Sequence, residues 1–315
     1  MSFTVGVDVG GTKVIAGVVT ERGEVLSIEK HTTPRDDAPA TVAIIASAVR
    51  NLSTEYPVTA IGIGAAGWID STGSVVQHAP NLGWRGVPLR AQVSDATQLP
   101  VTVENDANAA AWAEYRFGAG RGGTNVVAVT VGTGIGGGVV LNGAVYRGSY
   151  GQAGEFGHTQ MVEDGLPCGC GGFGCWEQYG SGTALTRYAR EYATAYPDDA
   201  EVLGTLSDDA EITGPMVARA AARGDKAALH AFAEVGRWIG VGLADVVSSW
   251  DPDHIVVGGG VVETGALLME PIAATYARIL AERGRPQPVA TVAAAQLGNM
   301  AGLRGAADLA QSAAR

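Results

Sequence analysis

The chain carries one structural pattern twice, and this repetition constrains its fold more than any other feature. The first copy occupies residues 5–29 and the second occupies residues 125–146. Each copy has three short apolar strands with a glycine-rich turn between the first two, and an alternation of helices and strands follows each. Two β-β-β-α-β-α units predict an α/β protein of two lobes with a cleft between them.

The spacing of apolar residues places the remaining elements. In the first half we expect strands at 59–65 and 101–104 and helices at 39–52, 87–97 and 107–117. In the second half we expect strands at 254–257 and 289–294 and helices at 181–196, 214–224, 226–249, 264–282 and 300–313. The smaller lobe is predicted to contain residues 1–117 and about 300–315, and the larger lobe residues 118–299, with a hinge at 118–123.

The three cysteines of the chain, Cys168, Cys170 and Cys175, lie close together, and His158 lies just upstream. An odd number of thiols cannot form a closed set of disulfides, and the glycines between them let the sulfur atoms converge. Three thiolates and one imidazole form a ligand set that zinc takes as a closed tetrahedral structural site. The alternative is a group of buried free cysteines beside an unrelated histidine. The clustering favours zinc.

Glycine-rich turns carry the residues expected to hold a nucleotide. Asp8 lies near the end of the first strand and Gly10-Gly11-Thr12-Lys13 follows, so backbone amides reach phosphate while the carboxylate holds Mg²⁺ through water. Gly132-Thr133-Gly134-Ile135-Gly136 is the matching turn of the second copy. Gly258-Gly259-Gly260 is predicted to form one wall of the adenosine site. The alternative is an ordinary strand-to-helix turn. The G-x-G-x-x-G match at 132–137 precedes a strand, not the helix of a dinucleotide fingerprint, and no P-loop motif occurs.

Polar residues at the end of the strand at 101–104 are candidates for catalysis. Asp106 is placed to take a proton from an attacking hydroxyl, and Asn105 to bind a neighbouring hydroxyl. Both residue types also cap helices, so a structural role at the start of the next helix is the alternative. Glu155 and Glu177 flank the metal loop, and such groups suit the vicinal hydroxyls of a sugar.

Charge and composition narrow the classes of function. The net charge of −11 disfavours nucleic acid and membrane surfaces as partners, and no signal peptide or transmembrane segment is recognisable. Reduced, clustered cysteines fit the cytoplasm. Nucleotide binding stays compatible with an acidic chain, because amides and a metal ion hold phosphates without a basic patch. We therefore expect a cytoplasmic enzyme that acts on small molecules.

From about Thr4 to Ala307 the chain resembles the ROK family of sugar kinases and regulators, and within it the bacterial glucokinases. The motifs that carry the resemblance are Asp8-Val-Gly-Gly-Thr12, Glu104-Asn-Asp-Ala107, Val131-Gly-Thr-Gly-Ile-Gly-Gly-Gly138, Gly154-Glu-Phe-Gly-His158 and Cys168-Gly-Cys-Gly-Gly-Phe-Gly-Cys-Trp-Glu177. The resemblance implies a two-lobed actin-like (RNase H-like) ATPase fold, with ATP and Mg²⁺ in the cleft and structural zinc at the four residues named above. One departure from the family pattern is Asp245, where Asn is expected.

The resemblance also implies roles for individual residues. Asp106 would be the general base, and the sugar would be held by Gly67, Asn81, Asn105, Glu155, His158 and Glu177. The implied reaction moves the γ-phosphoryl group of ATP to the 6-hydroxyl of glucose. N-acetylmannosamine, N-acetylglucosamine or fructose is an alternative acceptor, and polyphosphate an alternative donor. A homodimer or homotetramer is expected from the habit of the family.

A sugar-sensing transcriptional regulator is the alternative from another class of protein, since the family contains repressors. Those proteins resemble this chain with an added N-terminal helix-turn-helix. The first predicted strand starts by Thr4 and leaves no room for one, and the acidic charge disfavours DNA. The sequence therefore favours the kinase.

Overall fold

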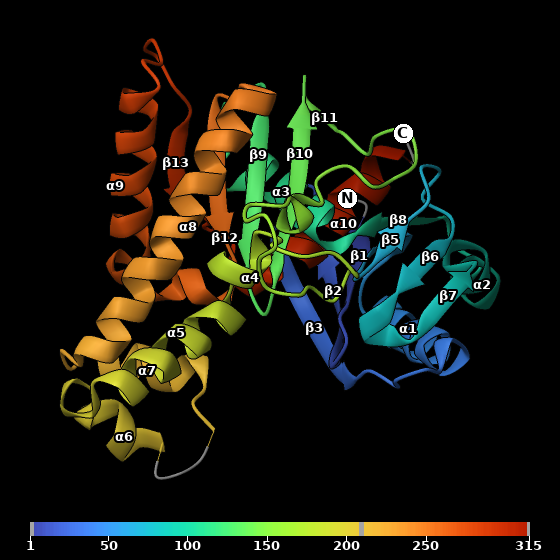
Figure 1. Cartoon of the computed structure of the whole chain (residues 1–315). Helices are drawn as coiled ribbons and strands as arrows, with labels where there is room; N and C mark the ends of the chain where they lie inside the picture. Colours follow the sequence, from blue (N-terminus) through green and yellow to red (C-terminus); the bar gives the residue numbers. More distant parts are fainter. Residues whose placement is uncertain (1–2, 208–210, 314–315) are drawn as a thin grey trace. The chain divides into compact units, whose positions relative to one another are not determined.

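The protein is described here by a computed structural model that covers residues 3–207 and 211–313 and divides into two compact units (Figure 1). The first unit lies within residues 1–128, 137–154 and 296–315, and the second within 129–136 and 155–295. The C-terminal helix thus groups with the N-terminal part of the chain. Segments 118–128 and 137–154, which the sequence analysis assigned to the larger lobe, group with it as well.

A five-stranded sheet with the order β3-β2-β1-β4-β8 forms the centre of the first unit. Its strands are β1 (Phe3–Val9), β2 (Lys13–Val19), β3 (Val25–Thr32), β4 (Val58–Ala65) and β8 (Val101–Asn105). β1 is antiparallel to β2 and parallel to β4, which is parallel to β8. Buried valines and isoleucines of β1, β2 and β4 lie in the core together with apolar residues of segments 38–52 and 69–93, and alternate residues of the edge strand β3 are exposed. The carboxyl ends of three parallel strands therefore meet at one edge of the sheet.

Helices and short 3-10 turns complete the first unit. They are α1 (Ala38–Ser53), α2 (Leu89–Thr97), α3 (Asp106–Phe117), η5 (Gly298–Met300) and α10 (Ala301–Ala313). α10 packs against α3, β1 and β4. This close approach requires glycine at Gly6 and Gly62 of the sheet, because a methyl group there would overlap backbone oxygens of α10. Buried Asp308 of α10 accepts hydrogen bonds from Trp112 Nε1 (2.7 Å) and Arg116 Nε (2.9 Å) of α3.

A small three-stranded sheet lies between β4 and α2 in the chain, where the sequence analysis expected no strand. It consists of β5 (Trp68–Ile69), β6 (Val76–Ala79) and β7 (Trp84–Val87), with η1 (Pro80–Leu82) between the last two. These strands have two to four residues, too few to show an alternation of apolar and polar side chains. Two of the predicted sugar-loop residues adjoin this sheet: Gly67 directly precedes β5, and Asn81 lies in η1.

The second sheet repeats the strand order of the first. It has the order β11-β10-β9-β12-β13, so in both sheets the third, second, first, fourth and fifth strands of the pattern follow one another. The strands are β9 (Val126–Val131), β10 (Ile135–Leu141), β11 (Ala144–Val145), β12 (His254–Gly258) and β13 (Thr291–Ala294). Boundaries of the two units fall within β9 and β10. The repeated order confirms the predicted α/β fold built from two copies of one pattern.

The second unit is rich in helices. These are α4 (Glu177–Gly180), α5 (Gly182–Ala195), α6 (Glu201–Ser207), α7 (Gly214–Ala221), α8 (Lys226–Trp250) and α9 (Ala266–Glu282), with 3-10 turns η2 (Phe156–His158), η3 (Pro197–Asp199) and η4 (Gly260–Thr264). The long helix α8 packs against both α9 and α5 (Figure 1). Asp245 of α8 forms an ion pair with Arg283 (2.7 Å), which gives this departure from the family pattern a local partner. Within residues 3–207 and 211–313, each helix lacks either the length or the apolar character to cross a membrane.

Candidate functional site

The register of the first sheet brings the predicted catalytic residues to one edge. Asp8 of β1 lies opposite Gly64 of β4, which in turn lies opposite Glu104 of β8. Asp106, two residues beyond Glu104, is the first residue of α3, one residue earlier than the helix start that the sequence analysis expected. Parallel strands that end in register therefore place Asp8 and Asp106 at the same edge.

Asn105 performs the capping role that sequence reasoning gave to Asn or Asp. Its Oδ1 accepts a hydrogen bond from the backbone N–H of Asn108 (3.0 Å), which caps α3. Its Nδ2 donates to the backbone oxygen of Gly67 (3.0 Å). The start of α3 and the Gly67 loop are thus joined, and the Asp106 side chain is free of the capping role.

Burial makes both carboxyl groups harder to ionise. It raises the pKa of Asp106, although a hydrogen bond from the N–H of Ala107 (2.9 Å) acts in the opposite direction. Burial also raises the pKa of Asp8 to about 7, with the negative charge of Asp106 as the second cause. A cation bound near two carboxylates that repel each other lowers their electrostatic energy, so this edge of the sheet suits a cation.

The glycine-rich hairpin of the first copy, predicted to bind phosphate, packs against the Asn81 loop. Gly10 N–H donates to the backbone oxygen of Lys13 (3.0 Å), which closes the turn, while Thr12 and Lys13 are exposed. A methyl group on Gly11 would lie 3.1 Å from the backbone oxygen of Asn81. The structure therefore brings Gly11 and Asn81 into contact, which their separation in sequence did not reveal.

An ion pair that sequence reasoning missed lies at the end of β8, next to the edge that carries Asp8 and Asp106. Buried Glu104 accepts from Arg147 Nε (2.7 Å), and its other oxygen accepts from the N–H of Asn105 (3.0 Å) and from Asn108 Nδ2 (3.1 Å). Arg147 begins the loop that ends at Gly154, immediately before Glu155 in the chain. The pair thus joins the end of β8 to the base of this loop. The position of Glu104 in the motif Glu104-Asn-Asp-Ala107 was the available signal, but nothing local identified its partner.

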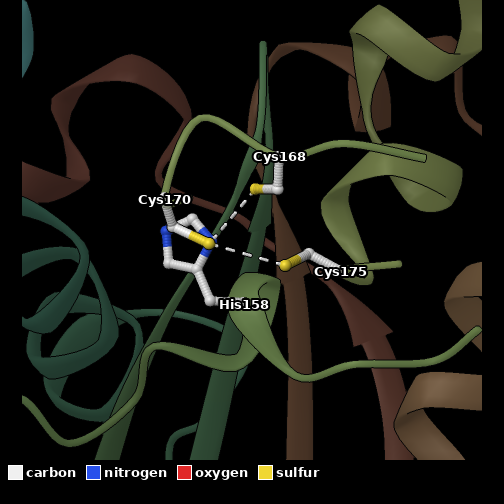
Figure 2. A group of neighbouring side chains, drawn as sticks. All are labelled: His158, Cys168, Cys170 and Cys175. Carbon is white, nitrogen blue, oxygen red and sulfur yellow. Dashed lines mark hydrogen bonds between the residues drawn. The ribbon is translucent and has the colours of Figure 1, made fainter. Parts of the chain in front are cut away.

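In the second unit, the predicted metal ligands converge (Figure 2). One ligand atom from each of His158, Cys168, Cys170 and Cys175 lies within 4.8 Å of every other. Cys168 Sγ is 3.7 Å from His158 Nδ1, and Cys170 Sγ is 3.6 Å from Cys175 Sγ. All three cysteines are free, since the sulfur atoms are too far apart for a disulfide.

The spacing and chemistry of this cluster fit zinc. A tetrahedral ion with Zn–S bonds of about 2.3 Å separates its sulfur ligands by about 3.8 Å, close to the observed distances. Burial raises the pKa of the Cys168 thiol to about 12 and also raises the pKa of Cys175, whereas the N–H of Gly172 lowers the pKa of Cys170. A bound cation would favour the thiolate forms of Cys168 and Cys175, which burial disfavours.

Glu177 lies beside the cluster, at the start of α4. Its Oε1 is 3.1 Å from Cys168 Sγ and 3.7 Å from His158 Nδ1. The neighbouring Trp176 is buried, donates from Nε1 to the backbone oxygen of Trp238 (2.8 Å), and packs where Gly242 leaves room on α8. Trp176 therefore fixes the position from which Glu177 reaches the cluster. Glu155 precedes η2, the turn that carries His158.

A cavity of about 1030 Å³ lies within the second unit. It is lined by Gly132, Thr133 and Gly260 of the predicted nucleotide residues. Gly134, Gly258 and Gly259 do not line it, and Gly259 instead packs against the backbone of Val131. Residues that the sequence analysis missed, among them Thr183, Thr213 and Glu263, also line it. Their helices and turns are far apart in the chain, so no local motif joins them.

Comparison with known proteins decides the family. The ROK family model matches residues 4–313. The chain belongs to the ROK family. It is 51% identical to the glucokinase of Streptomyces coelicolor over 313 residues, which is 99% of this chain and 98% of that protein.

Solved structures of ROK proteins share the fold over nearly the whole chain. A ROK family glucokinase from Streptomyces griseus, crystallised with glucose and AMPPNP, is 50% identical, with a TM-score of 0.89 and coverage of 98% of this chain and 99% of that chain. The ROK hexokinase of Thermus thermophilus is 35% identical, with a TM-score of 0.83 and coverage of 99% of both chains. The fold is the actin-like ATPase fold, as the sequence motifs predicted.

Proposed function

We propose that this ROK protein is an ATP-dependent glucokinase that phosphorylates the 6-hydroxyl of glucose. The observation that carries the proposal is the near-complete match, at about half identity, to a ROK glucokinase whose crystal structure holds glucose and AMPPNP. The geometry of the chain supports it, because a buried carboxyl at Asp106, a sheet edge with Asp8 and a cavity beside Gly132 are parts that phosphoryl transfer needs.

In the proposed reaction, the 6-oxygen of glucose attacks the γ-phosphorus of ATP as the bond to the bridging β-γ oxygen breaks, and ADP leaves. Asp106 accepts the hydroxyl proton as the new bond forms. We assign the sugar hydroxyls to Asn105, Glu155, His158 and Glu177, with the Gly67 and Asn81 loops as further contacts. These residues would orient the sugar for attack.

The nucleotide is assigned to the glycine turns and the cavity. Backbone amides at Gly10–Lys13 and at Thr133 and Gly134 would hold phosphates, and Gly260 with its neighbours would hold the adenosine. Mg²⁺ bound through Asp8 would neutralise charge on the phosphates. Zinc on His158 and the three cysteines would hold the loop that carries Glu177. We further propose that the enzyme is a cytoplasmic homodimer or homotetramer.

A panel of acceptors and donors tests the proposal. With ATP as donor, we expect kcat/KM for glucose to exceed that for N-acetylmannosamine, N-acetylglucosamine and fructose by at least about 10-fold, the effect of one well-placed contact. Polyphosphate in place of ATP is expected to give little product. A coupled assay for ADP measures the rates with ATP, and a direct assay for sugar phosphate measures the product formed with either donor. Preference for an N-acetyl sugar would contradict the assignment, and specific gel-shifts of genomic DNA would favour the regulator.

The Glu104–Arg147 ion pair gives a second prediction. Arg147→Met leaves Glu104 buried without its charged partner, so the loop before Glu155 loses its anchor. We expect kcat/KM for glucose to fall by about 10- to 100-fold, the value of one charged hydrogen bond, while KM for ATP changes less. Steady-state kinetics with each substrate varied in turn measure the effects on glucose and on ATP separately. Arg147→Lys keeps the charge and should recover part of the loss. Equal increases in both KM values would indicate a general loss of structure instead.

A further inference from the structure

The carboxylate of Glu177 lies between the metal cluster and the glycine turn at 132–136. One oxygen, Oε1, is 3.1 Å from Cys168 Sγ. The other oxygen, Oε2, lies so close to Gly134 that a methyl group on that residue would overlap it. Glu177 therefore fills the space between a predicted zinc ligand and a turn assigned to phosphate. Only glycine at position 134 permits this approach.

A second contact joins the same two features. Gly157 lies in η2, the turn that carries His158, and a methyl group there would overlap the backbone oxygen of Ile135. The His158 turn and the glycine turn thus touch through their backbones. Two neighbours of the metal cluster, Glu177 and Gly157, thus contact the segment 132–136, and each contact depends on a glycine.

The glycine turn is anchored from its other side by the start of α5. Gly182 N–H donates to the backbone oxygen of Gly132 (2.7 Å), and Thr183 Oγ1 donates to that of Thr133 (2.7 Å). Gly132, Thr133, Gly182 and Thr183 all line the cavity. A displacement of the turn at Gly134 is therefore transmitted to the wall of the cavity by short hydrogen bonds.

We propose that Glu177 is a positioning residue that couples the metal cluster to the nucleotide site. A metal ion that gathers His158 and Cys168 would fix Glu177 and the His158 turn, and these would fix Gly134 and Ile135. Binding of the metal ion would then strengthen binding of the nucleotide, and the reverse. This coupling does not require a bound sugar. This inference rests on the proposed function in one respect, the assignment of the glycine turn to phosphate.

A matched pair of glycine variants tests the coupling from the side of the turn. Gly134→Ala displaces the Glu177 carboxylate, whereas a methyl group on Gly132 meets no atom within 4 Å. We expect the zinc dissociation constant to rise by about 10-fold in Gly134→Ala and to stay unchanged in Gly132→Ala. Competition with a chromophoric chelator measures it, without nucleotide or sugar. Equal zinc affinity in the two variants would overturn the proposal.

A double variant shows whether Glu177 carries the effect. In a Glu177→Ala background the methyl group on residue 134 has no carboxylate to displace, so Gly134→Ala should change zinc affinity by less than about 2-fold. An undiminished effect in that background would assign the loss to the turn itself and not to Glu177. Circular dichroism of each variant establishes that it is folded.

The wild-type chain provides the reciprocal test, which does not depend on any variant folding. Coupling between two sites is symmetric, so zinc should tighten AMPPNP binding by the same factor by which AMPPNP tightens zinc binding, within the usual range of about 5- to 150-fold. Calorimetry of zinc-loaded and chelated protein measures the first factor. Equal AMPPNP affinity in both forms would overturn the coupling, whereas no AMPPNP binding to the zinc-loaded form would overturn the proposed function.

Discussion

Replacing Asp106 with asparagine should lower kcat for glucose phosphorylation by about 10²- to 10⁴-fold, the usual contribution of a general base. The amide keeps the shape of the side chain, and its oxygen can still accept the hydrogen bond from Ala107 N–H (2.9 Å), but it cannot take a proton. KM for glucose should change far less than kcat. Steady-state kinetics of Asp106→Asn test this, with Asp95→Asn, an exposed aspartate of α2, as the control.

The pH dependence provides a second signature of the same group. Because burial raises the pKa of Asp106, its carboxyl stays protonated to a higher pH than an exposed aspartate. Activity of the wild-type enzyme should therefore fall as the pH decreases through the raised pKa values of Asp106 and Asp8, and the residual activity of Asp106→Asn should keep only the part of the decrease that belongs to Asp8. A variant that keeps the wild-type profile with most of its kcat would exclude Asp106 as the base.

The thermal stability of Asp106→Asn distinguishes a loss of catalysis from a loss of folded structure. A carboxyl group whose pKa is raised on folding contributes most to stability below its unfolded pKa, and that contribution is lost as the pH rises through the folded pKa. Above the raised pKa of Asp106, the wild-type protein thus carries a buried charge that Asp106→Asn lacks. In that range, where activity has reached its upper plateau, the variant should have a Tm no lower than that of the wild type.

The features that the sequence predicted best are those made by neighbouring residues. The three cysteines lie within one loop, so their sulfur atoms can meet without any contact between distant segments. A glycine-rich turn between two apolar strands predicts a hairpin. The repeated strand pattern also predicted the α/β fold, because both copies have the same order of elements. In each of these cases, the local chemistry and the overall fold require the same arrangement.

Features that depend on contacts between distant segments were not predictable. Glu104 was visible as a polar residue at the end of a strand, but Arg147, its partner within the first unit, follows a different strand. Likewise, Glu177 was assigned to a sugar without any indication that it lies against Gly134. The strands of the small sheet were too short to show a periodicity. A single sequence records which side chains are present, and only the folded chain shows which of them meet.

Removal of one metal ligand should have the second large effect. Cys170 is exposed, so replacing its sulfur with the hydroxyl of Cys170→Ser disturbs little packing but removes one of four predicted zinc ligands. We expect the variant to be purified with little zinc and to lose about 100-fold or more in kcat/KM for glucose. His158 and Glu177 would then lack the ion that fixes the loop between them. Elemental analysis and kinetics provide the measurements.

The control lies one residue away. A methyl group on Gly169 meets no atom within 4 Å, so Gly169→Ala alters the same loop without touching a ligand, and it should keep both zinc and activity. Structural zinc sites supply folding free energy directly, so Cys170→Ser should also unfold at a lower temperature than Gly169→Ala. If Cys170→Ser loses its zinc yet binds glucose as tightly as the control, the metal serves stability alone, and the loop reaches its binding conformation without it.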